Sequence, residues 1–232
     1  MNNRARWPWD LIVPVIILAG GTILARLTGL DITVERFFYE AGRGWPWGER
    51  QPWRWLYNYG TIPAQVCAWA AFGVLLASLF LRGARRWWRE ASFLVLVMLL
   101  GPGLLVNTIF KAHWGRPRPL DCTHFSGDKP FLPVWTRGEP SGGQSFPSGH
   151  ASMGFYWLAP FFIFRRHDPA WARFFLAFGI CFGLLMGLTR MVQGSHFPSD
   201  VLWSFGFVYL TGWALARLLK PGCRRHARTQ GD

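Results

Sequence analysis

Acidic residues are scarce in this chain, and cysteines are few. Twelve Asp and Glu residues stand against 25 Lys and Arg among 232 residues, so the formal net charge is +13 at pH 7. The four cysteines match no zinc-binding spacing. The sequence also lacks internal repeats, low-complexity linkers and any composition shift that would mark a second domain. Residues 1–232 are therefore expected to form a single domain, and neither a zinc site nor an internal disulfide is predicted.

The excess of positive charge does not predict a nucleic-acid partner, because it is confined to alternate segments of the chain. Basic residues precede the first apolar run, follow the last one and fill two loops between: Arg4, Arg6, Arg82, Arg85, Arg86, Arg89, Arg165, Arg166, Arg173, Lys220, Arg224, Arg225 and Arg228. Segment 31–60, by contrast, carries four acidic residues and four arginines. Membrane proteins show this asymmetry because cytoplasmic loops retain Lys and Arg. We therefore expect both termini to be cytoplasmic.

Apolar residues form long blocks, which are typical of membrane spans. Six runs approach the roughly 20 residues that cross a bilayer, and they cover about 11–30, 61–81, 91–110, 149–164, 171–188 and 201–219. The fourth run is the shortest and contains Pro160, whose freed backbone group neighbouring helices can satisfy. The first run is long and lacks a small-residue cleavage site, so it predicts a retained anchor. The sequence predicts an all-α bundle of six transmembrane helices, with outer loops at 31–60, 111–148 and 189–200.

Three fragments far apart in the chain carry polar side chains suited to phosphate. They are Lys111 to Pro119 (KAHWGRPRP), Pro147 to His150 (PSGH), and Arg190 with His196 and Asp200. Each fragment lies at the end of an apolar run, and the predicted topology puts all of them on the outer side of the membrane. The predicted topology depends on basic residues in other loops. The common location of the three fragments on one side of the membrane is therefore a partly independent check that they form one site.

The residue types in these fragments suit phosphoryl transfer. This reaction needs positive groups that neutralise the charge on the phosphoryl oxygens, and a nucleophile placed in line with the bond that breaks. Lys111, Arg118 and Arg190 supply three cations, and the arginine forks fit phosphate oxygens in pairs. Ser148 and Gly149 lie where a loop turns into a helix, so backbone N–H groups can bind an anion there.

Two histidines in the fragments are candidates for the chemical steps. Four positions separate His196 from Asp200, so the carboxylate is expected to orient one imidazole nitrogen and leave the other to attack. His150 is placed to protonate the leaving oxygen, although the helix start beside it disfavours a charged imidazole. Asp200 is the only acid in the fragments, so no magnesium site, no other metal and no cofactor is predicted.

These residues resemble the type 2 phosphatidic acid phosphatase family, whose signature is Lys-x6-Arg-Pro, Pro-Ser-Gly-His and Ser-Arg-x5-His-x3-Asp. Lys111 with Arg118, the run Pro147 to His150, and Arg190 with His196 and Asp200 follow this spacing. Thr189 replaces the usual serine and keeps a hydroxyl group. The motifs cover about residues 105–205.

The resemblance implies His196 as a nucleophile that forms a phosphohistidine, Asp200 as its orienting residue and His150 as the general acid. It implies phosphate binding by Lys111, Arg118, Ser148, Gly149 and Arg190, without a metal. It also implies a helical core like that of vanadium haloperoxidases, and a bacterial inner-membrane enzyme whose site faces outward. Substrates of bacterial members are phosphatidylglycerol phosphate, undecaprenyl diphosphate, phosphatidic acid and lipid A phosphates, so the expected partners are such lipids and not nucleic acids.

Two other functions stay open at this point. A phosphotransferase would use the same histidine but pass the phosphate to another lipid, and the sequence does not separate it from a hydrolase. A transporter of lipid phosphates would carry charges inside its spans, whereas the span interiors here are almost free of them apart from Arg26, near an end. The segments 31–60, rich in tryptophan, and 120–146 are candidate rims or covers of the site. In segment 120–146 the polar candidates for contact with the substrate are Asp121, Asp128, Lys129, Arg137 and Glu139, and nothing in the sequence favours one of them over the others.

Overall fold

The computed structural model describes residues 9–134 and 136–222, and within this part it is helical with no β-strand. The long helices are α1 (Trp9–Thr28), α4 (Ile62–Phe80), α5 (Trp88–Met98), the π-helix η2 (Leu99–Phe110), α9 (Pro169–Met191) and α10 (Pro198–Leu219). The short α-helices are α2 (Leu30–Arg36), α3 (Trp53–Tyr59), α6 (Lys111–His113), α7 (Gly149–Phe155) and α8 (Ala159–Phe164). Short 3₁₀ turns are η1 (Ala84–Trp87), η3 (Pro119–Asp121), η4 (Thr123–Phe125), η5 (Pro140–Gly142) and η6 (Tyr156–Leu158). The prediction of an all-α fold is confirmed for this part of the chain.

Five helical segments of the described residues are long and apolar enough to cross a membrane. They are Trp9–Thr28, Trp53–Phe80, Ala84–His113, Pro169–Met191 and Pro198–Leu219. The run at 149–164 is helical too, but it is divided into α7, η6 and α8. The division falls just before Pro160, because a proline ring clashes with the carbonyl four residues earlier and forces the chain out of a regular helix. The sixth crossing therefore stays a prediction.

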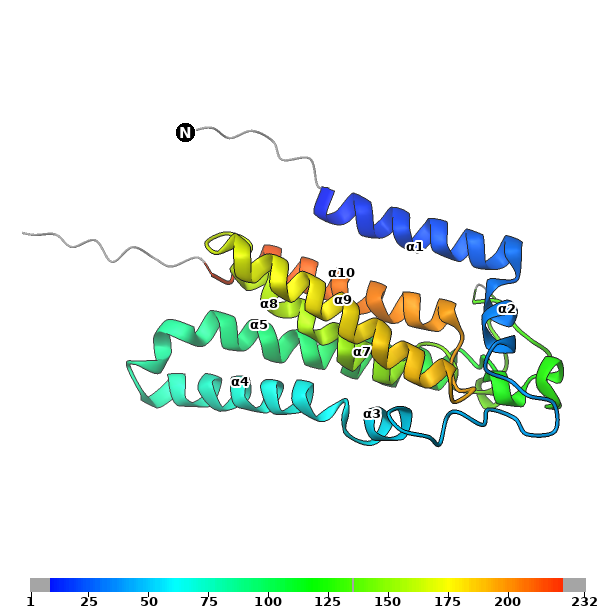
Figure 1. The fold of residues 1–232 in the computed structure, drawn as a ribbon. Helices are drawn as coiled ribbons and strands as arrows, with labels where there is room; N and C mark the ends of the chain where they lie inside the picture. Colours follow the sequence, from blue (N-terminus) through cyan, green and yellow to red (C-terminus); the bar gives the residue numbers. More distant parts are fainter. Residues whose placement is uncertain (1–8, 135, 223–232) are drawn as a thin grey trace, which may run out of the picture.

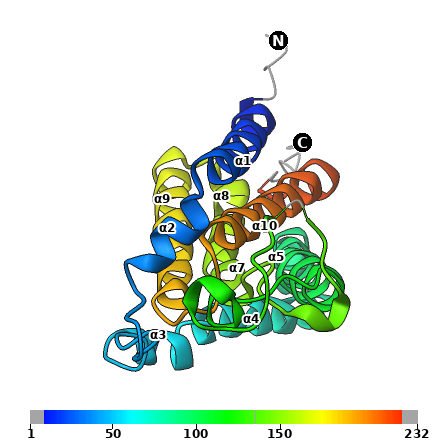
Figure 2. The same cartoon turned by 90° about the vertical axis from the view of Figure 1, so that its right-hand side faces the viewer.

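The long helices run side by side, and the connections that carry the predicted site gather at one end of the bundle (Figure 1). The short helices α2 and α3 lie at that end, and the segments between α6 and α7 cover it in the end-on view (Figure 2). The connections α4–α5 and α8–α9, which contain the basic residues Arg82, Arg85, Arg165 and Arg166, lie at the opposite end. Arg4, Arg6, Arg224, Arg225 and Arg228, which support the prediction for the termini, and Cys223 lie outside the described residues.

Glycines on α9 let neighbouring helices approach closely. A Cβ atom on Gly183 would stand 2.1 Å from Phe155 of α7, and one on Gly187 would stand 2.4 Å from Val201 of α10. Small residues at such contacts are the usual way for membrane helices to pack tightly. The result is that α7, α9 and α10 start or end close together, and each carries a fragment of the predicted site.

The π-helix η2 extends the third long helical segment as far as the first fragment. Asn107 donates from Nδ2 to the carbonyl of Pro102 at 2.7 Å, and Thr108 donates from Oγ1 to Gly103 at 3.1 Å, each across five residues. Pro102 lacks a backbone N–H and disturbs the ordinary α-helical pattern, which is a known cause of such wider turns. Lys111 follows directly after η2 and so lies at the end of the bundle that holds the other fragments.

Candidate active site

The structure brings the three fragments together at one end of the bundle. The backbone N–H of Leu120, just after the first fragment, donates to the carbonyl of Gly194 in the third at 3.0 Å. Lys111 of the first fragment approaches Gly149 of the second so closely that a Cβ atom there would be 3.4 Å from the lysine Nζ. Residues predicted to act together from their spacing alone are therefore neighbours in space.

Three cations of the predicted phosphate site form one cluster. Lys111 lies near enough to Arg118 and Arg190 for their charges to interact, and Arg190 is only 8% exposed. The Nε atoms of Arg118 and Arg190 are buried and have no hydrogen-bond partner within the described residues. Like charges gathered in a poorly hydrated place destabilise one another. A bound anion would offset this repulsion and accept the hydrogen bonds, so the cluster is suited to phosphate.

Ser148 and Gly149 shape the wall beside this cluster. Ser148 is fully buried and caps α7, because its Oγ accepts a hydrogen bond from the backbone N–H of Ala151 at 3.4 Å. A Cβ atom on Gly149 would lie 2.8 Å from Oδ1 of Asn107, in addition to its approach to Lys111. Position 149 thus leaves no room for a side chain next to the lysine.

The ring of His196 is buried and held in one tautomer. Its Nδ1 lies 2.5 Å from the carbonyl oxygen of Ser145, and a carbonyl only accepts, so Nδ1 carries the hydrogen. The lone pair is therefore on Nε2, the nitrogen left to react. Burial lowers the pKa of His196 to about 4, although Asp200 opposes this shift. The imidazole is neutral near pH 7, as a nucleophile must be.

Asp200 lies beside His196 but does not hold it in the way that the sequence spacing suggests. Its Oδ2 is 3.8 Å from Nδ1 of His196, which is too long for a hydrogen bond. The carboxylate instead accepts from Arg116 at 2.5 Å, from the Ser145 hydroxyl at 2.6 Å and from the Phe197 backbone at 2.8 Å. These three donors keep Asp200 in place. Asp200 therefore acts on the imidazole through its charge, and it is also linked to the ring by Ser145, whose hydroxyl binds Asp200 and whose carbonyl binds His196.

Arg116 is a residue of the site region that motif spacing does not single out. Its side chain is fully buried, and it donates from Nη2 to Asp31 at 2.7 Å and from Nη1 to Ser199 at 2.8 Å, besides its bond to Asp200. The charges of Asp200 and Asp31 raise the pKa of Arg116, although burial alone would lower it. Asp31 also accepts from the Ser199 backbone at 2.9 Å. Arg116 therefore bridges two buried carboxylates and joins α2 to the start of α10.

The sequence does contain a weak signal for this network. Arg116 precedes Pro117 inside the first fragment, and Asp31 comes directly after the first apolar run on the predicted outer side. The two residues are 85 positions apart, however, and no periodicity or local spacing pairs residues at that distance.

Segment 31–60 contributes packing around the loop that carries His196. Trp45 donates from Nε1 to the buried Glu35 at 3.1 Å, and its ring packs on Gly194, where a Cβ atom would be 2.4 Å away. Burial raises the pKa of Glu35 well above its usual value, and its carboxyl is part of this packing. Trp47 and Trp55 are about half exposed, as expected of interfacial residues. Trp45 therefore packs against the loop that carries His196, whereas Trp47 and Trp55 lie at the surface.

Three of the five polar candidates in segment 120–146 bind backbone groups of that segment or of the first fragment. Asp121 accepts from the Arg118 backbone at 3.2 Å, and Lys129 donates to the carbonyl of Gly142 at 2.7 Å. Arg137 donates from Nε to the carbonyl of His113 at 3.0 Å. These contacts fix the path of the chain between the first two fragments.

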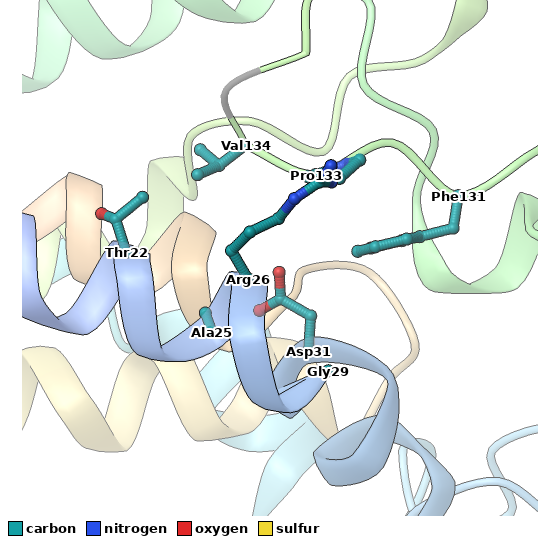
Figure 3. Close-up of a pocket in the computed structure, with 8 residues that line it drawn as sticks. All are labelled: Thr22, Ala25, Arg26, Gly29, Asp31, Phe131, Pro133 and Val134. Carbon is teal, nitrogen blue, oxygen red and sulfur yellow. The ribbon is translucent and has the colours of Figure 1, made fainter.

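A small pocket adjoins the buried network and not the cation cluster. It lies between the end of α1, the start of α2 and the segment 131–134 (Figure 3), and its lining is Thr22, Ala25, Arg26, Gly29, Asp31, Phe131, Pro133 and Val134. Asp31 thus faces this pocket and also bonds to Arg116. Over residues 9–134 and 136–222, no group of three His, Cys, Asp or Glu side chains is arranged to hold a metal ion.

The fold and the site together define a multi-pass membrane protein in which a cluster of cations and a buried, neutral histidine lie at one end of the bundle. The chain belongs to the PAP2 superfamily, which it matches over residues 90–221, more than half of its length. The match confirms the family that the three motifs predict.

Named relatives agree with this assignment. The chain is 42% identical over 147 residues to the lipid A 4'-phosphatase of Francisella tularensis subsp. novicida (strain U112), covering 62% of this chain and 65% of that protein. It is 35% identical over 106 residues to the lipid A 1-phosphatase of Rhizobium johnstonii (strain DSM 114642 / LMG 32736 / 3841), covering 45% and 38%. It is 30% identical over 122 residues to the undecaprenyl-diphosphatase BcrC of Bacillus subtilis (strain 168), covering 51% and 55%. The matches thus span less than two thirds of these curated relatives, and no solved structure matches the chain.

Proposed function

We propose that this protein hydrolyses the phosphate or diphosphate of a membrane lipid headgroup, without a metal, through a phosphohistidine at His196. The observation that carries the proposal is the hydrogen bond from His196 Nδ1 to the carbonyl of Ser145, which leaves Nε2 with its lone pair. The cluster of Lys111, Arg118 and Arg190 supports it, because these cations suit the charge on phosphoryl oxygens.

The proposed reaction has two steps. Nε2 of His196 attacks phosphorus while the bond from phosphorus to the lipid oxygen breaks, and protonated His150 gives its proton to that oxygen. Water then attacks the phosphohistidine and gives a proton to His150, the phosphorus–nitrogen bond breaks, and free phosphate leaves. Asp200, held by Arg116, stabilises the positive charge that develops on the His196 ring.

The substrate that we propose first is a lipid A phosphate, because the lipid A 4'-phosphatase matches more of this chain, at higher identity, than the undecaprenyl-diphosphatase does. Undecaprenyl diphosphate is the next candidate, on the name of the Bacillus relative. Phosphatidylglycerol phosphate and phosphatidic acid complete the set. Six spans with cytoplasmic termini and an outward-facing site in the inner membrane agree with the basic residues at the opposite end of the bundle (Figure 1).

Phosphate release from a lipid panel tests the function. Purified protein is given lipid A, undecaprenyl diphosphate, phosphatidylglycerol phosphate and phosphatidic acid in mixed micelles, with and without EDTA. We expect release from at least one lipid, undiminished by the chelator and abolished in His196→Ala. Release that stops in EDTA would contradict the metal-free mechanism, and absence of release from all four lipids would contradict the function.

A further inference from the structure

Tyr57, on the short helix α3, contacts two of the proposed catalytic and phosphate-binding residues at once. Its ring stacks on the imidazole of His150, with centroids 4.9 Å apart and planes 18° from parallel. The Cζ atom of Arg190 lies 4.5 Å from the centre of the same ring. The main chain of Tyr57 also interacts with the His150 imidazole. No motif includes this residue, which lies more than 90 positions before His150 in the sequence.

The position of Tyr57 is fixed by the packing of α3 against α9. Leu56 is buried, and a Cβ atom on Gly60 would stand 2.5 Å from Sδ of Met186. Tyr57 itself is 40% exposed, so its ring covers the site from the outer side. A rigidly held ring can in turn hold the side chains stacked on it.

The contact between the Tyr57 ring and the His150 imidazole affects the protonation of His150. His150 must carry a proton when the leaving oxygen departs, yet burial disfavours the charged imidazole, and the nearby charges of Arg190 and Lys111 oppose it further. The face of an aromatic ring attracts a cation, so Tyr57 favours the protonated imidazole. A contact of this kind changes an equilibrium roughly threefold to thirtyfold.

We infer that Tyr57 is a positioning residue that holds His150 in place and supports its protonated form while the leaving group departs. The inference rests on the proposed function, because it assigns His150 to that step. It makes the aromatic segment 31–60 part of the reaction and not only a membrane anchor.

A matched pair of soluble substrates tests this role. The leaving group of 4-nitrophenyl phosphate is acidic and departs without protonation, whereas 4-nitrobenzyl phosphate has nearly the same shape and releases a basic alkoxide that needs a proton. The values of kcat/KM are compared, because they report on formation of the phosphoenzyme. In Tyr57→Leu we expect kcat/KM for the benzyl ester to fall about tenfold more than for the phenyl ester. His150→Asn should show the same selectivity.

Two variants serve as controls for this experiment. Tyr57→Phe keeps the ring and should stay within about threefold of the wild type on both esters. Tyr59→Leu removes an exposed aromatic side chain of the same helix, one that packs on Trp55 instead, and should leave both values unchanged.

Equal losses on the two esters in Tyr57→Leu would show a merely structural role and overturn the inference, as would no loss at all. Either result leaves the proposed function intact, provided that the wild type releases phosphate from the lipid panel. A wild-type protein that releases phosphate from neither ester nor from any lipid would overturn both proposals together.

Discussion

Arg116 donates to Asp200 at 2.5 Å, and both side chains are completely buried. The same guanidinium reaches Asp31 at 2.7 Å, so one cation lies between two carboxylates, and all three side chains are buried. A buried charge that loses its partner is costly, even where the intact pair adds little net stability. Arg116 is thus the charged member of the three donors that hold Asp200 beside His196.

Replacing Arg116 should therefore damage both stability and activity. Arg116→Met leaves two buried carboxylates without their cation, and we expect a loss of about 3–5 kcal/mol of unfolding free energy. Thermal unfolding in detergent micelles measures the loss, and phosphate release follows the activity. The matched control is Arg43→Met, whose partner Glu40 is exposed, and it should change stability by less than about 1 kcal/mol. Equal stability of Arg116→Met and the wild type would contradict the bridging role.

A methyl group at position 149 should weaken phosphate binding without unfolding the protein. In Gly149→Ala the new Cβ atom meets Oδ1 of Asn107 at 2.8 Å, so Asn107 must shift, and this happens beside Nζ of Lys111, which is 3.4 Å from the new atom. Misplacing such a group costs roughly tenfold to a hundredfold in kcat/KM. Gly73→Ala in α4 is the control, because nothing lies within 4 Å of its Cβ position. Unchanged kinetics in Gly149→Ala would show that the close approach of Gly149 and Asn107 beside Lys111 does not matter for phosphate binding.

The titration of His196 should reveal its buried, neutral state. Since burial lowers its pKa from 6.5 to about 4, the imidazole stays neutral down to about that pH and gains a proton only below it. NMR spectra of histidine-labelled protein, with His196→Gln to assign the signal, give the midpoint directly. A midpoint near 6.5 would mean that the ring is hydrated and would remove the support for a neutral nucleophile.

The orientation in the membrane can be tested independently of chemistry. A reporter enzyme that is active only outside the cytoplasm, fused after residue 130, should be active, since this position lies at the end of the bundle that holds the site. A fusion after residue 83, in the basic connection between α4 and α5, should be inactive. The reverse pattern would invert the proposed topology.

Local spacing in the sequence singles out candidate residues that the fold brings together, but it does not predict their contacts. Lys111, Ser148, Arg190 and His196 are found from fixed local spacing and from their positions at the ends of apolar runs, both of which depend on neighbours in the chain. The acceptor for His196 is a backbone carbonyl, that of Ser145, and any residue type could provide it. A pattern of side chains does not reveal a backbone acceptor, and it therefore points to Asp200 as the hydrogen-bond partner of His196 instead.

Contacts between distant segments are the other part that the sequence does not predict. Arg116 and Asp31 meet only because α2 folds against the start of α10, and Tyr57 meets His150 only because α3 packs on α9. The helix at 149–164 is divided just before Pro160, and the proline is a local cause of this division. The sequence alone does not predict it, because packing against neighbouring helices decides whether a run that contains proline stays straight. Such features depend on tertiary structure and not on local propensity.

The central claim is that phosphate passes through His196, and trapping the intermediate tests it most directly. Protein mixed with lipid A labelled in its phosphates is quenched in alkali within milliseconds to seconds, because phosphohistidine survives base and is lost in acid. We expect label on the wild-type protein, mapped to His196, and none on His196→Ala that inserts normally in the membrane. Turnover of the labelled lipid without any label on the wild-type protein, or label that persists in His196→Ala, would contradict the mechanism.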